Sequence, residues 1–289
     1  MISLDTRLQG SVLCLRGSMI KFPGTGADIE ICGSATRPLS MYLNRQYIKI
    51  MEDHGVSSDI FLELQAEAVE TLRRTTRNGI NAALFLSRNS VAKAAFFPWL
   101  VRELYNLSFS VLDDNFVREI LELAVLVELR ELKYRARILV ENGVTLYGIM
   151  DETNTLGEGE IYCCTDKYIL QGPVTIGRAP ALHPGDMQVV MATDVPATSP
   201  LKELHNCIVF SQQGLRDLPS QLSGGDLDGD LYSVIYDPRL QLKKTYQAAE
   251  YPRVPPVEIK RAVNRKDITD FFIQFMENDQ LGRIANLHL

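Results

Sequence analysis

Three aspartates in one short stretch are the residues of this sequence best suited to chemistry. Asp226, Asp228 and Asp230 occupy alternate positions between a pair of glycines and the hydrophobic run 231–235. Alternate residues of an extended strand point to the same side, so the three carboxylates can share one face. Like charges that lie so close repel one another unless a cation lies between them. Because carboxylate oxygens suit hard divalent cations, the spacing predicts a site for one or two Mg²⁺ or Mn²⁺ ions.

The residues around the aspartates support a rigid site that a ligand can approach. Gly224, Gly225 and Gly229 allow tight turns and lack the Cβ that would obstruct a close approach. The hydrophobic run that follows would anchor the loop to a buried strand. A calcium loop of the EF-hand type is excluded, because its sixth and twelfth positions need glycine and glutamate, and here they hold Leu231 and Asp237.

The composition is that of a globular protein with a sizeable core. Hydrophobic residues make up 46% of the 289 positions and charged residues 23%, so more than one structural unit is expected. The net charge of −6 gives no overall attraction to nucleic acid, so such binding must be local. Five cysteines without a C-x-x-C pair indicate a reducing compartment and no zinc site. No signal peptide or membrane-spanning run is visible, so we expect an intracellular protein, in the cytoplasm or nucleus, without a membrane partner.

Helical periodicity dominates residues 41–134, which we expect to form a helical slab that packs and spaces the rest. One helix should end near Gly55, and Ser57 offers a cap for the next. Short helices follow between residues 78 and 97. A long helix from about Asn115 to Lys133 should turn Phe116, Ile120, Leu123, Leu126 or Val127, and Leu129 or Leu132 inward.

Strand patterns dominate residues 135–240 and indicate a compact barrel, because many short strands alternate with Gly and Pro turns. The expected strands cover 136–140, 144–150, 159–164, 168–176, 187–193, 207–210 and 231–236, and the aspartate loop enters the last. A type I′ hairpin is expected at Asn142-Gly143. Strand-like stretches also occur at 12–15 and 29–32. After the barrel we expect a helix at 240–249, a proline-rich linker and an amphipathic helix at 267–284.

The chain resembles the cell-encoded RNA-dependent RNA polymerases of eukaryotic RNA silencing. The stretch S-G-G-D-L-D-G-D-L-Y at 223–232 is similar to the catalytic D-L-D-G-D signature of that family. Four further stretches agree in order and approximate spacing, and they extend the resemblance over the whole chain. They are L-N-R-Q at 43–46 with E-D-H-G-V-S-S-D-I-F-L-E-L-Q at 52–65, M-D-E-T-N-T-L at 150–156, R-A-P-A-L-H-P-G-D at 178–186, and N-D-Q-L-G-R-I-A-N-L-H-L at 278–289.

The resemblance implies an α+β fold in which the aspartates belong to the second of two double-psi β-barrels. Residues 1–40 would end the upstream barrel region, 41–134 form the slab, 135–240 the barrel, and 241–289 a linker and the start of further helices. The first barrel and its basic residues would lie mostly before Met1, so the chain would be a fragment of the catalytic core. R-G-S-M-I-K-F at 16–22 resembles the family's R-P-S-M-x-K-F, with Gly17 in place of the usual proline.

The implied activity is template-directed RNA synthesis, a nucleotidyl transfer with two metal ions that serves RNA silencing and small interfering RNA production. Asp226, Asp228 and Asp230 would hold the metal, and the three glycines would leave the path of the primer end open. Arg178 would contact phosphate or template, or else donate a hydrogen bond to a barrel carbonyl. The implied partners are the RNA template and nascent strand, nucleoside triphosphates, the remainder of the polymerase core and other RNA-silencing proteins.

Two other functions stay open at this point. The chain could be a non-catalytic remnant of that fold that binds RNA or a partner. It could also be another metal-dependent phosphotransferase or nuclease, although no histidine stands beside the acidic loop to act as a general base. His183 and Asp186 are expected to shape their own turn. Asp151 and Glu152 would be either acids behind the metal ligands or part of a solvated turn.

Overall fold

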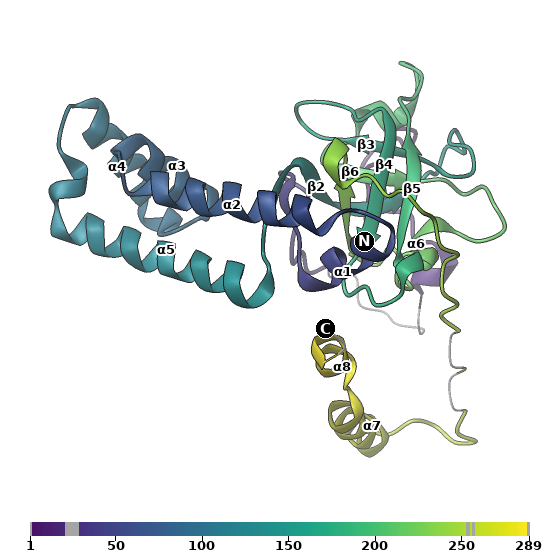
Figure 1. Cartoon of the computed structure of the whole chain (residues 1–289). Coiled ribbons are helices and arrows are strands. Elements are labelled where there is room, and N and C mark those ends of the chain that lie inside the picture. Colours follow the sequence, from purple (N-terminus) through teal and green to yellow (C-terminus); the bar gives the residue numbers. More distant parts are fainter. Residues whose placement is uncertain (1, 21–28, 253–254, 256–257, 288–289) are drawn as a thin grey trace. The chain divides into compact units, whose positions relative to one another are not determined.

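The structure is a computed structural model that describes residues 2–20, 29–252, 255 and 258–287 (Figure 1). The chain divides into two compact units. The barrel unit consists of Met1–Ser40, Asn142–Tyr236 and Lys244–His288, and the helical unit of Met41–Glu141 and Asp237–Lys243. Among the described residues, every helix is too short or too polar to cross a membrane.

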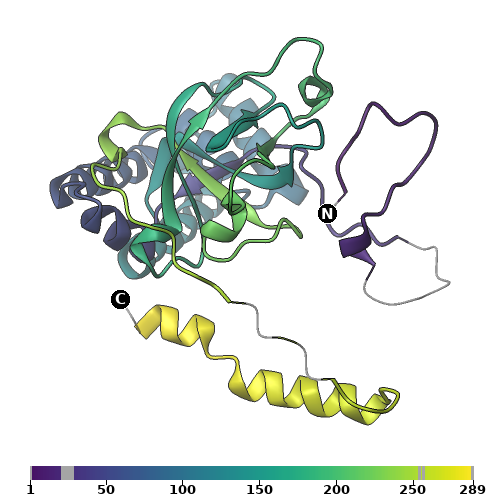
Figure 2. The same cartoon turned by 90° about the vertical axis from the view of Figure 1, so that its right-hand side faces the viewer.

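Six strands of a seven-stranded sheet close into a barrel (Figure 2). Around the barrel they run in the order β2 (Leu139–Met150), β6 (Cys207–Phe210), β3 (Glu160–Cys164), β5 (Met187–Ala192), β4 (Gly172–Arg178) and β7 (Leu231–Ile235). β7 then pairs with β2 and closes the ring, while β1 (Leu39–Tyr42) is added beside β2. The β2–β6 and β3–β5 pairs are parallel and the others around the ring are antiparallel. The predicted fold class, an α+β chain with a β-barrel between helices that precede and follow it in sequence, is confirmed, and the barrel has six strands.

Alternating apolar residues fill the barrel, as the period of two requires. The buried cluster takes residues from each of the six strands, including Leu146, Ile161, Val174, Ile176, Val190, Ile208, Phe210, Tyr232 and Val234. Phe210 and Tyr232 meet edge to face, with ring centroids 4.7 Å apart. Only glycine fits opposite this pair at position 148, because a Cβ there would lie 2.5 Å from a carbon of the Tyr232 ring.

The predicted hairpin at Asn142-Gly143 is wrong. β2 passes straight through these residues, since Gly143 pairs with Ile235 of β7 and the Asn142 carbonyl accepts a hydrogen bond from the Tyr236 amide at 2.9 Å. The strand is long because it changes partners at Tyr147, from antiparallel β7 to parallel β6. Pairing with strands distant in sequence overrides the local preference of Asn-Gly for a turn.

Five helices form the helical unit: α1 (Arg45–Asp53), α2 (Ser58–Thr75), α3 (Gly79–Arg88), α4 (Phe97–Asn106) and α5 (Asn115–Arg135). Polar caps begin four of them, because a side-chain oxygen accepts a hydrogen bond from an amide of the first turn. These caps are Asn44, Ser57, Asn78 and Asp114. Pro98 lies in the first turn of α4, where its missing N–H costs nothing, so it starts a helix there.

The inward face predicted for α5 is wrong by about one position, apart from the buried Leu132 and the partly buried Ile120, which both lie inward as predicted. Phe116 and Leu123 are 66% and 65% exposed, whereas their neighbours Val117 and Ala124 are buried. The helix carries apolar residues at adjacent positions, so periodicity fits two overlapping faces equally well. The packing inside the helical unit places the smaller residues of each pair inside.

The segments outside the two cores differ most from expectation. The described residues at 12–15 and 29–32 form no strand, and Gly17–Met19 form a single 3-10 turn. The helix expected at 240–249 is absent; after the short turn Pro238–Leu240 the backbone runs without a helix past the barrel. The helix expected at 267–284 is divided into α7 (Arg265–Asn278) and α8 (Leu281–Leu287), because Asp279 adopts an extended backbone.

Candidate metal centre

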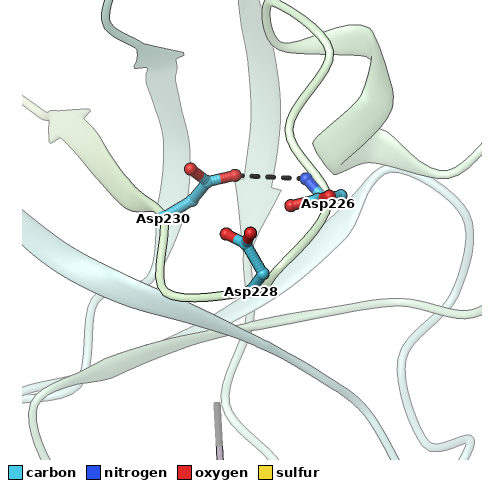
Figure 3. A group of neighbouring side chains, drawn as sticks. All are labelled: Asp226, Asp228 and Asp230. Carbon is cyan, nitrogen blue, oxygen red and sulfur yellow. Dashed lines mark hydrogen bonds between the residues drawn. The ribbon is translucent and has the colours of Figure 1, made fainter. Parts of the chain in front are cut away.

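The three aspartates lie on the loop between α6 (Leu218–Gln221) and β7, and Asp230 directly precedes the strand. Each offers one carboxylate oxygen, and these oxygens lie within 4.8 Å of one another. Figure 3 shows the side chains converging on a common space. Asp226 and Asp228 are exposed and Asp230 is half-buried. The structure therefore brings together the residues that the sequence proposed as metal ligands.

A turn, and not an extended strand, makes the carboxylates converge. Ser223, Gly224, Leu227 and Gly229 all have positive φ, and the value of 137° at Gly229 is accessible to glycine alone. An added Cβ at Gly229 would meet no atom within 4 Å, so this side of the loop faces open space. Gly225 is needed for packing, because its Cβ would lie 2.4 Å from the Tyr232 hydroxyl oxygen.

Two hydrogen bonds fix the carboxylate of Asp230. Its Oδ1 accepts from Arg178 Nη2 at 2.7 Å, and its Oδ2 accepts from the amide of Asp226 at 3.1 Å. The second guanidinium nitrogen of Arg178 donates to the Ser223 carbonyl at 3.1 Å. Burial alone would lower the pKa of Arg178, but its hydrogen bond and charge pairing with Asp230 raise it overall. Arg178 thus contacts the loop near its start, at Ser223, and at its last residue, Asp230.

The electrostatics of the loop suit a divalent cation. The charge of Asp226, partial burial and the charge of Asp230 raise the pKa of Asp228 above its usual value. The three side chains present only oxygen, the donor that Mg²⁺ and Mn²⁺ prefer. Because the three oxygens lie within 4.8 Å of one another, one cation could bind to all of them after a local adjustment of the side chains. The residues therefore fit a hard divalent metal ion.

A cavity of about 650 Å³ opens beside Asp226 and Asp228. Its walls come from the ends of β2 and β6, the residues after β6, α6, and the start of the chain. The lining includes Met150, Phe210, Ser211, Gln212, Ser220, Arg16, Ser18 and Met19. Its volume is in the range of small-molecule sites, about 300–1,000 Å³.

Sequence reasoning missed Ser211 and Gln212 as residues of this cavity. The sequence feature that could have identified them is their position directly after the strand 207–210. This position places them at the end of the barrel where the aspartates lie. Arg16, Ser18 and Met19 of the stretch R-G-S-M also line the cavity, and Arg16 pairs with Glu152 at 3.4 Å. Lys21 and Phe22 of that stretch lie outside the described residues.

The family model described as RNA dependent RNA polymerase matches residues 1–289. The chain belongs to this family. The resemblance seen in its motifs is confirmed. The chain is 32% identical over 288 residues to the probable RNA-dependent RNA polymerase 1 of Oryza sativa subsp. japonica. This alignment covers 96% of the chain and 37% of the relative.

Two further comparisons place this polymerase-family chain among longer proteins. It is 32% identical over 307 residues to RNA-dependent RNA polymerase 6 of Arabidopsis thaliana, covering 98% of the chain and 25% of the relative. The solved structure of RNA dependent RNA polymerase QDE-1 from Thielavia terrestris resembles 76% of the chain with a TM-score of 0.59 and 20% identity, which supports the fold. The match covers 27% of that structure. The chain therefore spans between 25% and 37% of the length of these proteins.

Asp151 of this polymerase-family chain organises a loop and does not lie in a solvated turn. It is fully buried, and its carboxylate accepts hydrogen bonds from the amides of Thr153, Thr155 and Leu156 at 2.7–2.9 Å. The Thr153 hydroxyl adds a fourth at 2.6 Å. Burial raises the pKa of Asp151, but the hydrogen bonds together lower it by more than burial raises it. The pKa of Asp151 therefore lies below the usual value.

Replacing Asp151 with asparagine is expected to lower the free energy of unfolding by about 2 kcal/mol at pH 7. An amide NH₂ cannot accept the bonds that one carboxylate oxygen accepts. Because the folded-state pKa of Asp151 is depressed, its stabilising effect is present above the unfolded-state pKa and is lost as the pH falls through the folded-state pKa. The difference from wild type should therefore shrink below about pH 4.

Urea unfolding at pH 7, 5 and 3 measures this difference, with exposed Asp113→Asn as the matched control. The control should follow wild type at each pH. A constant difference between Asp151→Asn and wild type across the three pH values would contradict a role for the ionised carboxylate.

His183 and Asp186 shape their own turn, as predicted. The Nδ1 atom of His183 accepts from the Gly185 amide at 3.0 Å. One oxygen of Asp186 accepts from the amides of Leu182 and His183, both at 2.9 Å. Asp186 is fully buried, so these bonds replace its hydration.

Proposed function

We propose that this chain forms part of the catalytic core of an RNA-dependent RNA polymerase that copies RNA templates in RNA silencing inside the cell. The observation that carries the proposal is the convergence of three carboxylate oxygens, within 4.8 Å of one another, beside a cavity of about 650 Å³. Membership of the polymerase family supports it. The RNA template and nascent strand, nucleoside triphosphates, the rest of the polymerase core and other RNA-silencing proteins are the proposed partners.

The division of labour within the chain is part of the proposal. Residues 135–240 provide the catalytic barrel and 41–134 a helical slab that supports it. Residues 1–40 end the upstream barrel region, since Arg16 and Met19 line the same cavity as the aspartates. Residues 241–289 connect the barrel to further helices, of which α7 and α8 are described.

Each residue of the site has a definable task in nucleotidyl transfer. Asp226, Asp228 and Asp230 would hold Mg²⁺ or Mn²⁺, which when bound lowers the pKa of an RNA 3′-hydroxyl and neutralises charge on the reacting phosphate. Asp230 is held in one orientation, while the exposed Asp226 and Asp228 can adjust to ligands. Gly229 leaves open space beside them, and Arg16 places a positive charge in the cavity wall, where it can attract a phosphate.

The geometry favours the polymerase over the two alternatives. A remnant that only binds RNA has no use for three close carboxylates, which repel RNA phosphates unless a metal is bound. A nuclease or phosphotransferase with a histidine base is disfavoured because none of the residues that line the described cavity is a histidine.

The metal site is tested directly by titrating the 289-residue chain with Mn²⁺ in a calorimeter. Wild type is expected to bind Mn²⁺, and Asp228→Ala should raise the dissociation constant by roughly tenfold to a hundredfold, as losses around metal ligands do. Glu141→Ala removes the same charge from an exposed position of the helical unit and should bind as wild type does. Equal binding by wild type and Asp228→Ala would remove the site assignment.

A further inference from the structure

The segment Arg178–Asp186 lies against the aspartate loop and holds it at several points. Arg178, the last residue of β4, donates to the Asp230 carboxylate at 2.7 Å and to the Ser223 carbonyl at 3.1 Å. One guanidinium thus ties the start of the loop to its last carboxylate. The two side chains of this ion pair are only 22% and 12% exposed, so solvent screens the pair far less than an ordinary surface pair. In addition, the Ser223 hydroxyl donates to the carbonyl of Pro180.

A second contact reaches the loop from the segment that follows the barrel. The hydroxyl of Tyr251 donates to the buried carboxylate of Asp186, whose other oxygen is held by two backbone amides. The Tyr251 ring lies against Gly224, where an added Cβ would be 3.4 Å from the ring. Burial and the hydrogen bond to Asp186 raise the pKa of Tyr251, so its hydroxyl keeps the proton that it donates. Tyr251 therefore connects the R-A-P-A-L-H-P-G-D segment to the glycines before the aspartates.

Such supports are needed because the loop is under strain. Three carboxylates within 4.8 Å repel one another, and the backbone at Ser223 and Leu227 has positive φ, which is unfavourable for residues with side chains. A loop of this kind would relax and separate its carboxylates unless its neighbours held it. Arg178, Pro180 and Tyr251 contact the loop on its barrel side. The opposite side of the loop faces the cavity and stays open.

We propose that Arg178 and Tyr251 are positioning residues that hold the aspartate loop in its metal-binding shape before the metal arrives. Arg178 aims the Asp230 carboxylate, and Tyr251 supports the backbone at Gly224. The planar guanidinium matters for Arg178, because its two nitrogens reach a carboxylate and a carbonyl together, which a lysine ammonium on a flexible stem cannot do with the same geometry. The proposal rests on the proposed function, since the prepared shape serves metal binding.

Conservative variants separate positioning from charge. Arg178→Ala would remove a positive charge beside the site as well as the two-point contact, and these two changes act on metal affinity in opposite directions. Arg178→Lys keeps the charge and removes only the geometry. Tyr251→Phe keeps the ring against Gly224 and removes the hydroxyl that donates to Asp186 and also contacts the Ser223 side chain. Matched controls are Arg88→Lys, at an exposed ion pair of α3, and Tyr168→Phe, which loses a hydroxyl paired with Tyr236 elsewhere in the barrel unit.

The experiment measures Mn²⁺ affinity of the 289-residue chain by electron paramagnetic resonance of the free ion, together with thermal unfolding. Arg178→Lys should raise the dissociation constant roughly tenfold and Tyr251→Phe about threefold or more, the scale for residues that orient metal ligands. Both controls should stay within about twofold of wild type. In the metal-free chain, amide hydrogen exchange at residues 223–230 should become faster in both variants, because the loop opens more often.

The outcomes distinguish this inference from the proposed function. If wild type does not bind Mn²⁺, the metal site itself is wrong. If wild type binds and both variants bind equally well, with unchanged exchange at 223–230, the metal site stands and the positioning roles are overturned. A lower melting temperature with unchanged Mn²⁺ affinity would also overturn them, because it would show a purely structural role. If Arg178→Lys does not fold, Tyr251→Phe and its exchange pattern decide.

Discussion

Replacing Asp230 with asparagine should lower RNA synthesis, in a polymerase that contains these 289 residues, by roughly a thousandfold or more. A metal ion contributes several kcal/mol of charge stabilisation in such reactions, and each 1.36 kcal/mol corresponds to about tenfold in rate. Asparagine keeps the shape of the side chain but removes the charge that attracts the metal. It also leaves the Arg178 guanidinium, now 2.7 Å from the Asp230 carboxylate, facing a neutral group.

Single-turnover extension on a defined RNA template measures this loss, and circular dichroism and template binding report on folding. Both should stay near wild type, because the substitution preserves volume and the side-chain oxygen can still accept a hydrogen bond. Asp270→Asn, on the exposed face of α7, is the matched control and should extend RNA at the wild-type rate. Synthesis by Asp230→Asn within about tenfold of wild type would place the chemistry on other groups.

The aspartate cluster could be predicted from the sequence because its information is local. Asp226, Asp228 and Asp230 stand within five residues, directly before a hydrophobic strand, so any compact arrangement keeps them close. The backbone that achieves this differs from the expected extended strand, because a turn with positive φ at Leu227 and Gly229 brings the side chains together. Residue type and spacing thus predicted the neighbours but not the path of the chain between them.

The supports of the loop could not be predicted in the same way because they join distant residues. Arg178 and Asp230 are 52 positions apart, and Tyr251 and Asp186 are 65 apart. No local pattern marks Tyr251, which lies in a segment for which the sequence favoured a helix or a linker. Pairing between distant residues also explains the error at Asn142-Gly143, where pairing with β7 replaced a turn. The error in α5 has a different cause, because its sequence offers two overlapping apolar faces.

The turn at Gly185 provides a second test of how the barrel supports the loop, and it concerns stability. A Cβ at this position would lie 2.1 Å from the carbonyl oxygen of Gln247 and 2.8 Å from Cα of Ala248. These are backbone atoms, so no side-chain rotation can relieve the contact and the segment itself must move. Gly185→Ala should therefore destabilise the chain by about 2–3 kcal/mol, as overpacking does. The melting temperature should fall by roughly 5–10 °C.

Displacement of Gln247 should also loosen the aspartate loop, because Tyr251, which supports that loop, lies four positions further along the same segment. Faster amide exchange at residues 223–230 is expected together with the lower melting temperature. Gly33→Ala is the matched control, since its Cβ would approach the Tyr147 hydroxyl only to an ordinary 3.8 Å. It should melt within about 2 °C of wild type. An unchanged melting temperature in Gly185→Ala would show that the segment after the barrel is not held against this turn, and Tyr251 would then lose its anchor.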